Sequence, residues 1–506
     1  MSHQSVLIIG AGLGGLATAL RLSSRGYRHI TIVEKASTPG GRLNILEKDG
    51  FRFDTGPSFF SMSYEFDELF RWCGFPNPLR YRPLDPLYTV YLAGHSRPFR
   101  IFRDLQRLEK EFEGVEPALA RKMERWLRNA GEIFKATEYR VVKKDFSSLA
   151  EYLWALAGVP WRHAPRMFMS MWRDLERHFQ SEEARIIFSL VSFFLGNTPF
   201  HTPAVYKLLS YTEFVHDGYW SVEGGMYSIV ESIVHILQQR GVRFEYEKEI
   251  TAPMMEEGRL RGFKTRDGRT FRADIFVCNS DAAAFRGLVL GRHRWQPPSL
   301  DKMEWTLAPF TMYVGLNTTL PSLNHHNYFL GSNFRDYAHT IFTSAEAPEK
   351  PYYYVNIPSK SDPFCAPEGC ENLFFLCPVP DLRYKPDWSD AEKLAEAILN
   401  DFEHRVGYPI RSHIITCTVW TPQDWQQRFN LYRGSGLGLA HGLNQIGGFR
   451  PALCDEEFPN LFYVGASTRP GTGLPMVVIG SRLVSEHILK RFPQRAELSE
   501  KSVVNM

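Results

Sequence analysis

The chain has 506 residues, of which 44% are hydrophobic, and its 59 basic and 56 acidic side chains leave a formal net charge of +3. A chain of this length buries a large interior and is expected to form two or three structural domains. The near balance of charge gives no indication of a nucleic-acid partner or a polyanionic substrate, and we expect neither.

The sequence also bears on cellular location. The amino-terminal residues lack the basic segment, apolar stretch and cleavage site of a secretory signal. The densest apolar stretch, residues 186–195, is about half as long as a membrane-spanning helix. The seven cysteines are scattered, which is typical of a protein whose thiols stay reduced. Cys365 and Cys370 are the only close pair, and a single pair is a weak zinc-binding pattern, so we expect no metal. We expect a cytoplasmic protein that does not cross a bilayer.

The first predicted unit is a buried strand, a glycine-rich turn and a helix. Residues 5–9 form a continuous apolar run, typical of a parallel strand that is covered on both faces. The turn then reads G-x-G-x-x-G. Gly10 allows the tight turn, Gly12 lets a pyrophosphate approach the backbone, and Gly15 lets the helix pack closely on the strand.

A second strand, residues 30–33, ends at Glu34, about twenty residues after the glycines, where a carboxylate accepts hydrogen bonds from ribose hydroxyls. The glycine turn alone would also fit an ordinary strand–helix connection. The complete order of strand, turn, helix, strand and acid favours a dinucleotide site. Lys35, the next residue, joins the cofactor-binding candidates.

A second glycine motif indicates which dinucleotide is bound. Gly40, Gly41 and Arg42 are followed by the segment DGFRFDTGP, residues 49–57. Two glycines allow close backbone approach, and a guanidinium offers a planar fork to phosphate or flavin carbonyl oxygens, although a lone arginine after a turn is usually a surface residue. The combination resembles the flavoprotein superfamily of amine oxidases and carotenoid desaturases. The resemblance implies FAD, with Gly41, Arg42, Gly56 and Pro57 at its site.

The middle of the chain changes character. Residues 88–92 and 97–102 predict a short hairpin, and a mainly helical region follows to about residue 200. Residues 154–179 interleave arginines with the large aromatic residues Trp154, Trp161, Phe168 and Trp172. Two interpretations stay open for this segment: ordinary amphipathic helices with one buried face, or a surface that enters the membrane interface.

The second half of the chain contains three further units. Residues 275–278 predict a buried strand that re-enters the nucleotide-binding domain. Alternating stretches between about 300 and 420 predict an antiparallel sheet that could form a wall of a substrate cavity. Residues 460–489 predict a strand, a long glycine and proline turn, and a helix whose N-terminus could approach an anion or a polar ring edge.

Four separated motifs narrow the resemblance. Residues 460–489, 436–451 and 195–206, together with the opening, resemble the bacterial and fungal phytoene desaturases, over essentially the whole chain. The resemblance implies that the terminal turn lies near the flavin ring, which adds Gly465, Gly473 and Val477 to the site. Arg469 stands where the family often has histidine, and Val222 stands where a proline commonly precedes the glycine pair. These two departures bear on which substrate is used and not on the cofactor.

The implied fold is of the α/β class. A Rossmann-like FAD-binding domain comprises residues 1–85, 216–300 and 420–506, and an inserted antiparallel-sheet substrate domain comprises 86–105 and 301–419. A helical, membrane-facing subdomain comprises 106–215.

The implied activity is that of an FAD-dependent carotenoid desaturase. It would introduce conjugated double bonds into C40 or C30 phytoene-type substrates by hydride transfer to the flavin, with oxygen or a quinone as electron acceptor. Its partners would be a lipophilic carotenoid and a membrane surface, to which it binds peripherally. No sequence motif identifies any of the 16 histidines as the catalytic base. The alternatives are a carotenoid oxygenase or late-pathway desaturase of a modified carotenoid, an amine oxidase, which the Gly-Thr-Gly at 471–473 disfavours, and a flavin-retaining carotenoid carrier.

Overall fold

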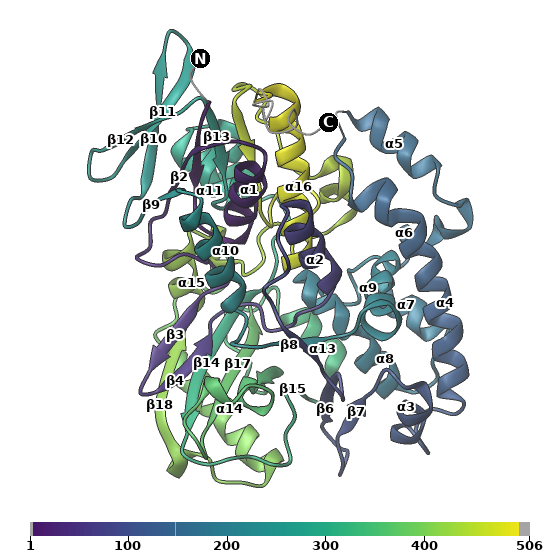
Figure 1. The fold of residues 1–506 in the computed structure, drawn as a ribbon. Coiled ribbons are helices and arrows are strands. Elements are labelled where there is room, and N and C mark those ends of the chain that lie inside the picture. Colours follow the sequence, from purple (N-terminus) through teal and green to yellow (C-terminus); the bar gives the residue numbers. More distant parts are fainter. Residues whose placement is uncertain (1–3, 147, 495–506) are drawn as a thin grey trace, which may run out of the picture.

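The computed structural model describes residues 4–146 and 148–494 (Figure 1). A five-stranded sheet has the order β19-β13-β1-β2-β9, and all of its pairings are parallel. Its strands are β1 (Ser5–Ile9), β2 (His29–Val33), β9 (Arg243–Glu245), β13 (Ile275–Cys278) and β19 (Leu461–Tyr463). Segments from both ends and the middle of the chain therefore build one sheet, and the predicted return of the chain at residues 275–278 is confirmed.

Both faces of this sheet are covered, which explains the unbroken apolar run of β1. Leu7 and Ile9 point to an antiparallel sheet of β10 (Ile250–Glu256), β11 (Arg259–Thr265) and β12 (Thr270–Arg272). Val6 and Ile8 point to the opposite layer of helices, α1 (Leu13–Ser24), α2 (Ser63–Trp72), α10 (Ser228–Gln239) and α16 (Leu474–Arg491). The first and last of these helices, α1 and α16, lie side by side (Figure 1).

A second sheet has seven strands in the order β18-β14-β17-β16-β15-β6-β7. Its strands are β6 (Tyr88–Leu92), β7 (Phe99–Ile101), β14 (Ala308–Leu316), β15 (His326–Leu330), β16 (Tyr353–Asn356), β17 (Glu371–Val379) and β18 (Ile414–Trp420). The predicted antiparallel pairing is confirmed except where β15 meets β6, which are parallel. One face packs on α14 (Ala391–Val406), and the other face contributes aromatic side chains to a core shared with the helical region.

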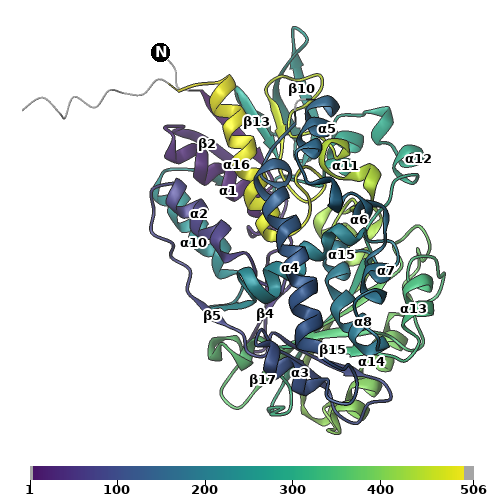
Figure 2. The same ribbon diagram turned by 90° about the vertical axis from the view of Figure 1, so that its right-hand side faces the viewer.

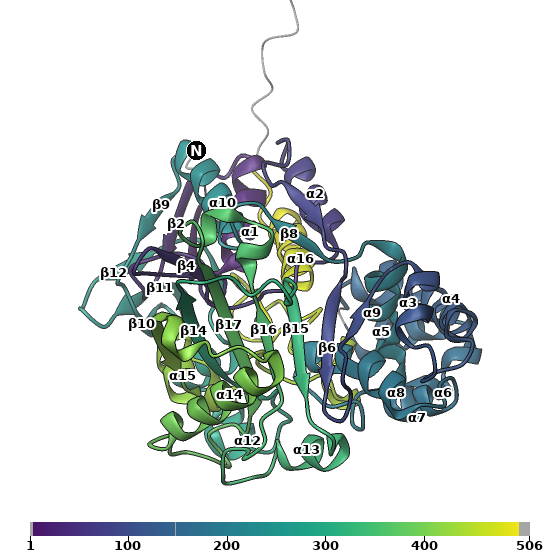
Figure 3. The ribbon, with the colours of Figure 1, turned by 90° about the horizontal axis from the view of Figure 1, so that it is seen from below.

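The helical region lies on one side of the molecule, next to β6 and β7 (Figure 1). It faces the viewer in Figure 2 and lies to the right of β6 in Figure 3. Its helices are α3 (Leu105–Glu111), α4 (Leu119–Thr137), α5 (Leu149–Ala157), α6 (Pro165–Phe168), α7 (Met171–Glu176), α8 (Glu182–Ser189) and α9 (Leu208–Tyr211). Trp126 of α4 is buried in the shared core and donates from Nε1 to Asp174 Oδ2 at 2.9 Å. Within the described ranges, no helix is both long and apolar enough to cross a membrane.

Candidate functional site

A cavity of about 910 Å³ begins at the carboxyl ends of β1 and β2 and continues between the seven-stranded sheet and the helical region. All but one of the predicted site residues line it: Gly10, Gly12, Glu34, Lys35, Gly41, Arg42, Gly56, Pro57, Gly465, Gly473 and Val477. The exception is Gly15, where a Cβ atom would overlap the carbonyl oxygen of Gly10. Gly15 therefore permits the close packing of helix on strand that its position in the motif predicts.

Glu34, directly after β2, lies beneath the glycine turn. Its carboxylate accepts hydrogen bonds from the backbone N–H of Ala11 at 2.7 Å and of Ala36 at 2.9 Å. Burial raises the pKa of this carboxyl, and the two backbone hydrogen bonds oppose that shift. The neighbouring Lys35 donates from Nζ to Asn430 Oδ1 at 2.7 Å, so it ties a distant loop to the same edge of the sheet. An acid in this place can accept from ribose hydroxyls.

The two glycine motifs lie directly against each other, because the backbone N–H of Gly40 donates to the carbonyl oxygen of Ala11 at 2.8 Å. A Cβ atom on Gly12 would lie 2.6 Å from Asn279 Nδ2, and one on Gly41 would lie 3.3 Å from the Cα atom of Gly12. Gly41 also has φ +59°, a conformation that favours glycine. Among the described residues, no side chain caps the N-terminus of α1, so its first N–H groups are open to a ligand. This cradle suits a pyrophosphate.

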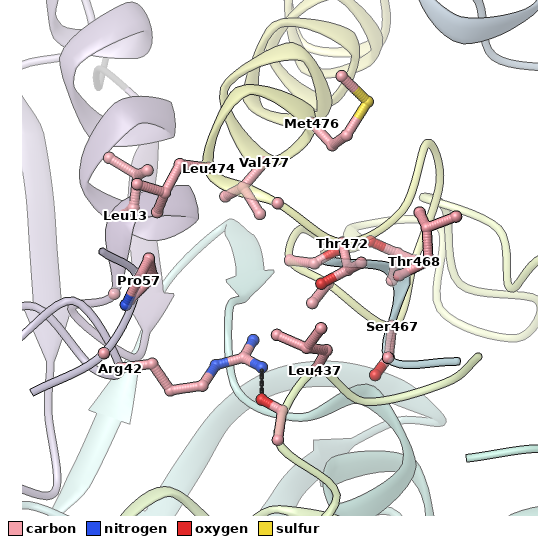
Figure 4. A pocket seen from close by; sticks show the side chains of 18 of the residues that line it. Leu13, Arg42, Pro57, Leu437, Ser467, Thr468, Thr472, Leu474, Met476 and Val477 are labelled. Atoms are coloured by element: carbon pink, nitrogen blue, oxygen red, sulfur yellow. Dashed lines mark hydrogen bonds between the residues drawn. The ribbon is translucent and has the colours of Figure 1, made fainter. Parts of the chain in front are cut away.

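The terminal turn closes the opposite side of the cavity. Figure 4 shows Leu13, Arg42 and Pro57 across from Leu437 and the side chains of the turn. Arg42 donates from Nη1 to the carbonyl oxygen of Gly436 at 2.7 Å. Burial lowers the pKa of Arg42, while the nearby Asp281 carboxylate opposes that shift. A fixed, charged guanidinium thus lines the cavity and contacts the segment 436–451, one of the motifs that carry the resemblance.

Asp281 and Asn279 were missed from the sequence. Asp281 accepts from the Ser467 hydroxyl at 3.1 Å and from the backbone N–H of Ala283 at 3.0 Å, so it joins the terminal turn to the chain after β13. Both residues follow the carboxyl end of a parallel strand, where ligands of α/β sheets bind. That rule could have identified them once residues 275–278 were recognised as a strand of this sheet.

Arg450 was also missed. Its buried guanidinium donates to five carbonyl oxygens at 2.6–3.1 Å, those of Leu439, Ala440, Gln445, Ala466 and Thr468. Burial lowers its pKa to about 10, which leaves it charged at neutral pH. Arg450 holds two loops together at the cavity wall. Because backbone carbonyls have no signature in the sequence, only the fold could reveal this role.

These observations fit FAD. The buried acid below the glycine turn, the glycine cradle and the arginine of the second glycine motif match what ribose, pyrophosphate and flavin ring require. The apolar remainder of the cavity lies beyond the terminal turn and is available to a second ligand.

Comparisons with known proteins agree with this reading. Residues 13–489 match the family of flavin-containing amine oxidoreductases. The chain is 34% identical over 492 residues to a zeta-carotene-forming phytoene desaturase of Myxococcus xanthus, covering 96% of this chain and 94% of that one. It is 30% identical to a phytoene desaturase of Fusarium fujikuroi, covering 96% and 89%.

The fold is similar to a solved cyclohexylamine oxidase of Brevibacterium oxydans, with a TM-score of 0.60 at 17% identity, covering 97% of this chain and 100% of that one. The expected α/β class and the resemblance to phytoene desaturases are thereby confirmed. The chain belongs to the family of flavin-containing amine oxidoreductases, and its cofactor is FAD.

Proposed function

We propose that this protein is an FAD-dependent carotenoid desaturase that introduces conjugated double bonds into a long isoprenoid chain. The observation that carries the proposal is the apolar cavity that continues from the terminal turn into the helical region. Its lining there includes Phe134, Val141, Leu156, Leu190 and Leu209 of the helical region, together with Leu307, which directly precedes β14. Two relatives that match almost the full chain are named as phytoene desaturases. A hydrocarbon chain is recognised by the shape and apolar burial that such a cavity provides.

Bound FAD supplies the hydride acceptor, and oxygen or a membrane quinone would reoxidise it. The chain's own residues align the polyene against the terminal turn and exclude water. Of the described histidines, only His441 lines the cavity. Its Nε2 accepts from the Thr472 N–H at 3.3 Å, and burial lowers its pKa. A neutral His441 in this position holds the turn, so we assign it as a positioning residue.

The test is incubation of the purified holoprotein with liposomes that contain phytoene or its C30 analogue. We expect products lighter by pairs of hydrogens, with red-shifted, structured absorption. Gain of oxygen instead would assign the chain to the carotenoid oxygenases. Failure to change any carotenoid while flavin occupancy is complete would contradict the proposal.

We further propose that part of the helical region contacts a membrane surface. Three of the four aromatic residues singled out in residues 154–179 are exposed: Trp161 by 87%, Phe168 by 84% and Trp154 by 74%. The fourth, Trp172, is buried in the core. Leu149 and Leu153 of α5 are also exposed. Neighbouring apolar side chains of this size on a surface are typical of an interaction site.

The same helices connect this surface with the cavity. Tyr152 and Leu156 on one side of α5 line the cavity, as does Met167 of α6. Exposed Arg140 and Arg162 flank the apolar side chains and could meet anionic head groups. A lipophilic substrate could then pass from the bilayer to the flavin without crossing water, and a peripheral location follows.

Co-sedimentation with anionic liposomes tests this surface. The triple variant Trp154→Ser, Trp161→Ser, Phe168→Ser should lose most binding without loss of stability, because the three side chains are exposed. Phe364→Ser removes an aromatic residue that is 77% exposed elsewhere and serves as the control. Equal binding by the triple variant and the native protein would contradict the assignment.

A further inference from the structure

The wall that the seven-stranded sheet presents to the cavity carries a polar cluster, which a hydrocarbon substrate does not require. Tyr328 of β15, Tyr354 of β16 and Tyr219 line the cavity. The rings of Tyr328 and Tyr354 are 5.2 Å apart. Behind them lie two buried ionisable groups, Glu213 and His326. We call these five residues, together with Tyr88, the tyrosine cluster.

Glu213 forms the inner end of the tyrosine cluster. It lies in the π-helical turn Thr212–His216, and the phenols of Tyr88 and Tyr219 face its carboxyl group. Burial raises its pKa to about 8, so the carboxyl is neutral at pH 7 and can donate a proton to a hydrogen bond. Irregular helical turns of this kind are frequent at functional sites.

His326 forms the other end. Its Nδ1 lies 2.6 Å from the Tyr354 hydroxyl, and its ring stacks on Phe59 with centroids 4.0 Å apart. Burial lowers its pKa, so the imidazole is neutral. With Nδ1 engaged, the orientation of the Tyr354 hydroxyl is fixed. Both ends of the cluster are therefore uncharged but polar.

Tyr328 stands between the two ends, and its side chain is only 7% exposed. Its ring centroid lies 5.6 Å from that of Tyr88. Its side chain lines the cavity, and its hydroxyl makes no hydrogen bond to another described residue. A pure hydrocarbon that filled the cavity would leave this hydroxyl without a partner, which is unfavourable, whereas phenylalanine would suit a hydrocarbon equally well in shape.

We propose that Tyr328 binds an oxygen atom of the ligand, so that the preferred substrate is a carotenoid that carries a hydroxyl or carbonyl group. This inference rests on the proposed function, because it assumes that the apolar ligand of the cavity is a carotenoid. Tyr328 would donate to or accept from the ligand oxygen, while Glu213 and His326 fix the orientations of the phenols around it. The substrate would thus come from a reaction that has already added oxygen to the chain.

The test compares the binding of two carotenoids of equal chain length, one a hydrocarbon and one with a terminal hydroxyl group. Binding is measured by the quenching of tryptophan fluorescence. We expect the native holoprotein to bind the hydroxylated compound more tightly. Tyr328→Phe should weaken its binding about tenfold and leave hydrocarbon binding nearly unchanged. Tyr91→Phe, on the opposite face of the same sheet, is the matched control and should change neither.

Equal affinity of the native protein for both carotenoids, or an equal effect of Tyr328→Phe on both, would overturn the inference. So would a defect of Tyr328→Phe confined to flavin reoxidation by a quinone, since the oxygen would then belong to the electron acceptor. Turnover is measured separately. Preferential binding of the hydroxylated compound without desaturation of either would contradict the proposed function and leave the inference supported.

Discussion

Arg469 and Asp145 form an ion pair, with 2.8 Å between Nη1 and Oδ1, that joins the terminal turn to the segment before α5. Arg469 also donates to the carbonyl oxygens of Phe146 at 2.6 Å and Gly448 at 2.9 Å. The sequence marked Arg469 as a departure from the histidine that is frequent in the family. Its role in the structure is to connect the flavin-facing turn with the helical region, which an imidazole is too short and has too few donors to do.

A double-mutant cycle with Arg469→Gln and Asp145→Asn should show strong coupling. Each single change removes the ion pair, although Asp145 keeps its contact with His487 Nε2 at 2.8 Å, and should lower the free energy of unfolding by about 1–3 kcal/mol. The double variant should lose less than the sum, by at least about 0.5 kcal/mol. Chemical denaturation of the holoprotein measures all four states. Strict additivity would mean that the ion pair contributes nothing of its own.

Glu34→Gln should weaken FAD binding about tenfold or more. The amide nitrogen has no lone pair to accept from Ala11 or Ala36, and it cannot replace the carboxylate toward the ribose hydroxyls. The measurement is equilibrium titration of the apoprotein with FAD. Glu47→Gln, at an exposed acid of β3 (Ile45–Lys48), should bind FAD like the native protein. Native affinity in Glu34→Gln would remove this residue from the site.

Gly12→Ala should lower FAD binding without unfolding the protein, whereas Gly26→Ala should lower stability without changing FAD binding. Gly12 has φ −71°, which alanine adopts without strain, but the added methyl group would enter the cradle near Asn279. We expect a folded protein with little bound FAD. Gly26 has φ +90° and open space around it, so alanine there should cost about 1 kcal/mol of stability without changing FAD affinity. Flavin content and thermal unfolding of both variants distinguish the two effects, and the reverse pattern would refute the assignment.

Glu213→Gln should change how stability depends on pH. Between the ordinary pKa of 4.5 and the folded pKa of about 8, the unfolded chain releases this proton while the folded protein retains it. The contribution of Glu213 to the free energy of unfolding is thus complete at low pH and is lost as the pH rises toward 8. Glutamine does not titrate, so the variant should lose less stability over this range. Parallel pH profiles for the variant and the native protein would contradict the raised pKa.

The parts of the fold and site that could be predicted from the sequence are those whose residues lie close together along the chain. The unit from β1 to Glu34 was recognisable because the strand, turn, helix and acid follow one another directly along the chain. The tyrosine cluster was not, because Tyr88, Glu213 and Tyr328 come from separate elements that meet only when β6 pairs with β15. The aromatic residues of 154–179 show the same limit. Residue type and spacing along the chain do not distinguish buried Trp172 from exposed Trp161.

The strand order β19-β13-β1-β2-β9 also has a consequence for biosynthesis. The first glycine turn follows β1 and emerges from the ribosome long before its partner turn, which follows β19. The cofactor cannot be enclosed until the turn after β19 has been made, and the nascent protein must keep a strand with two apolar faces from aggregating until then. The supply of FAD after the turn that follows β19 has been made should therefore govern the yield of folded protein, because FAD stabilises only a chain that contains both turns.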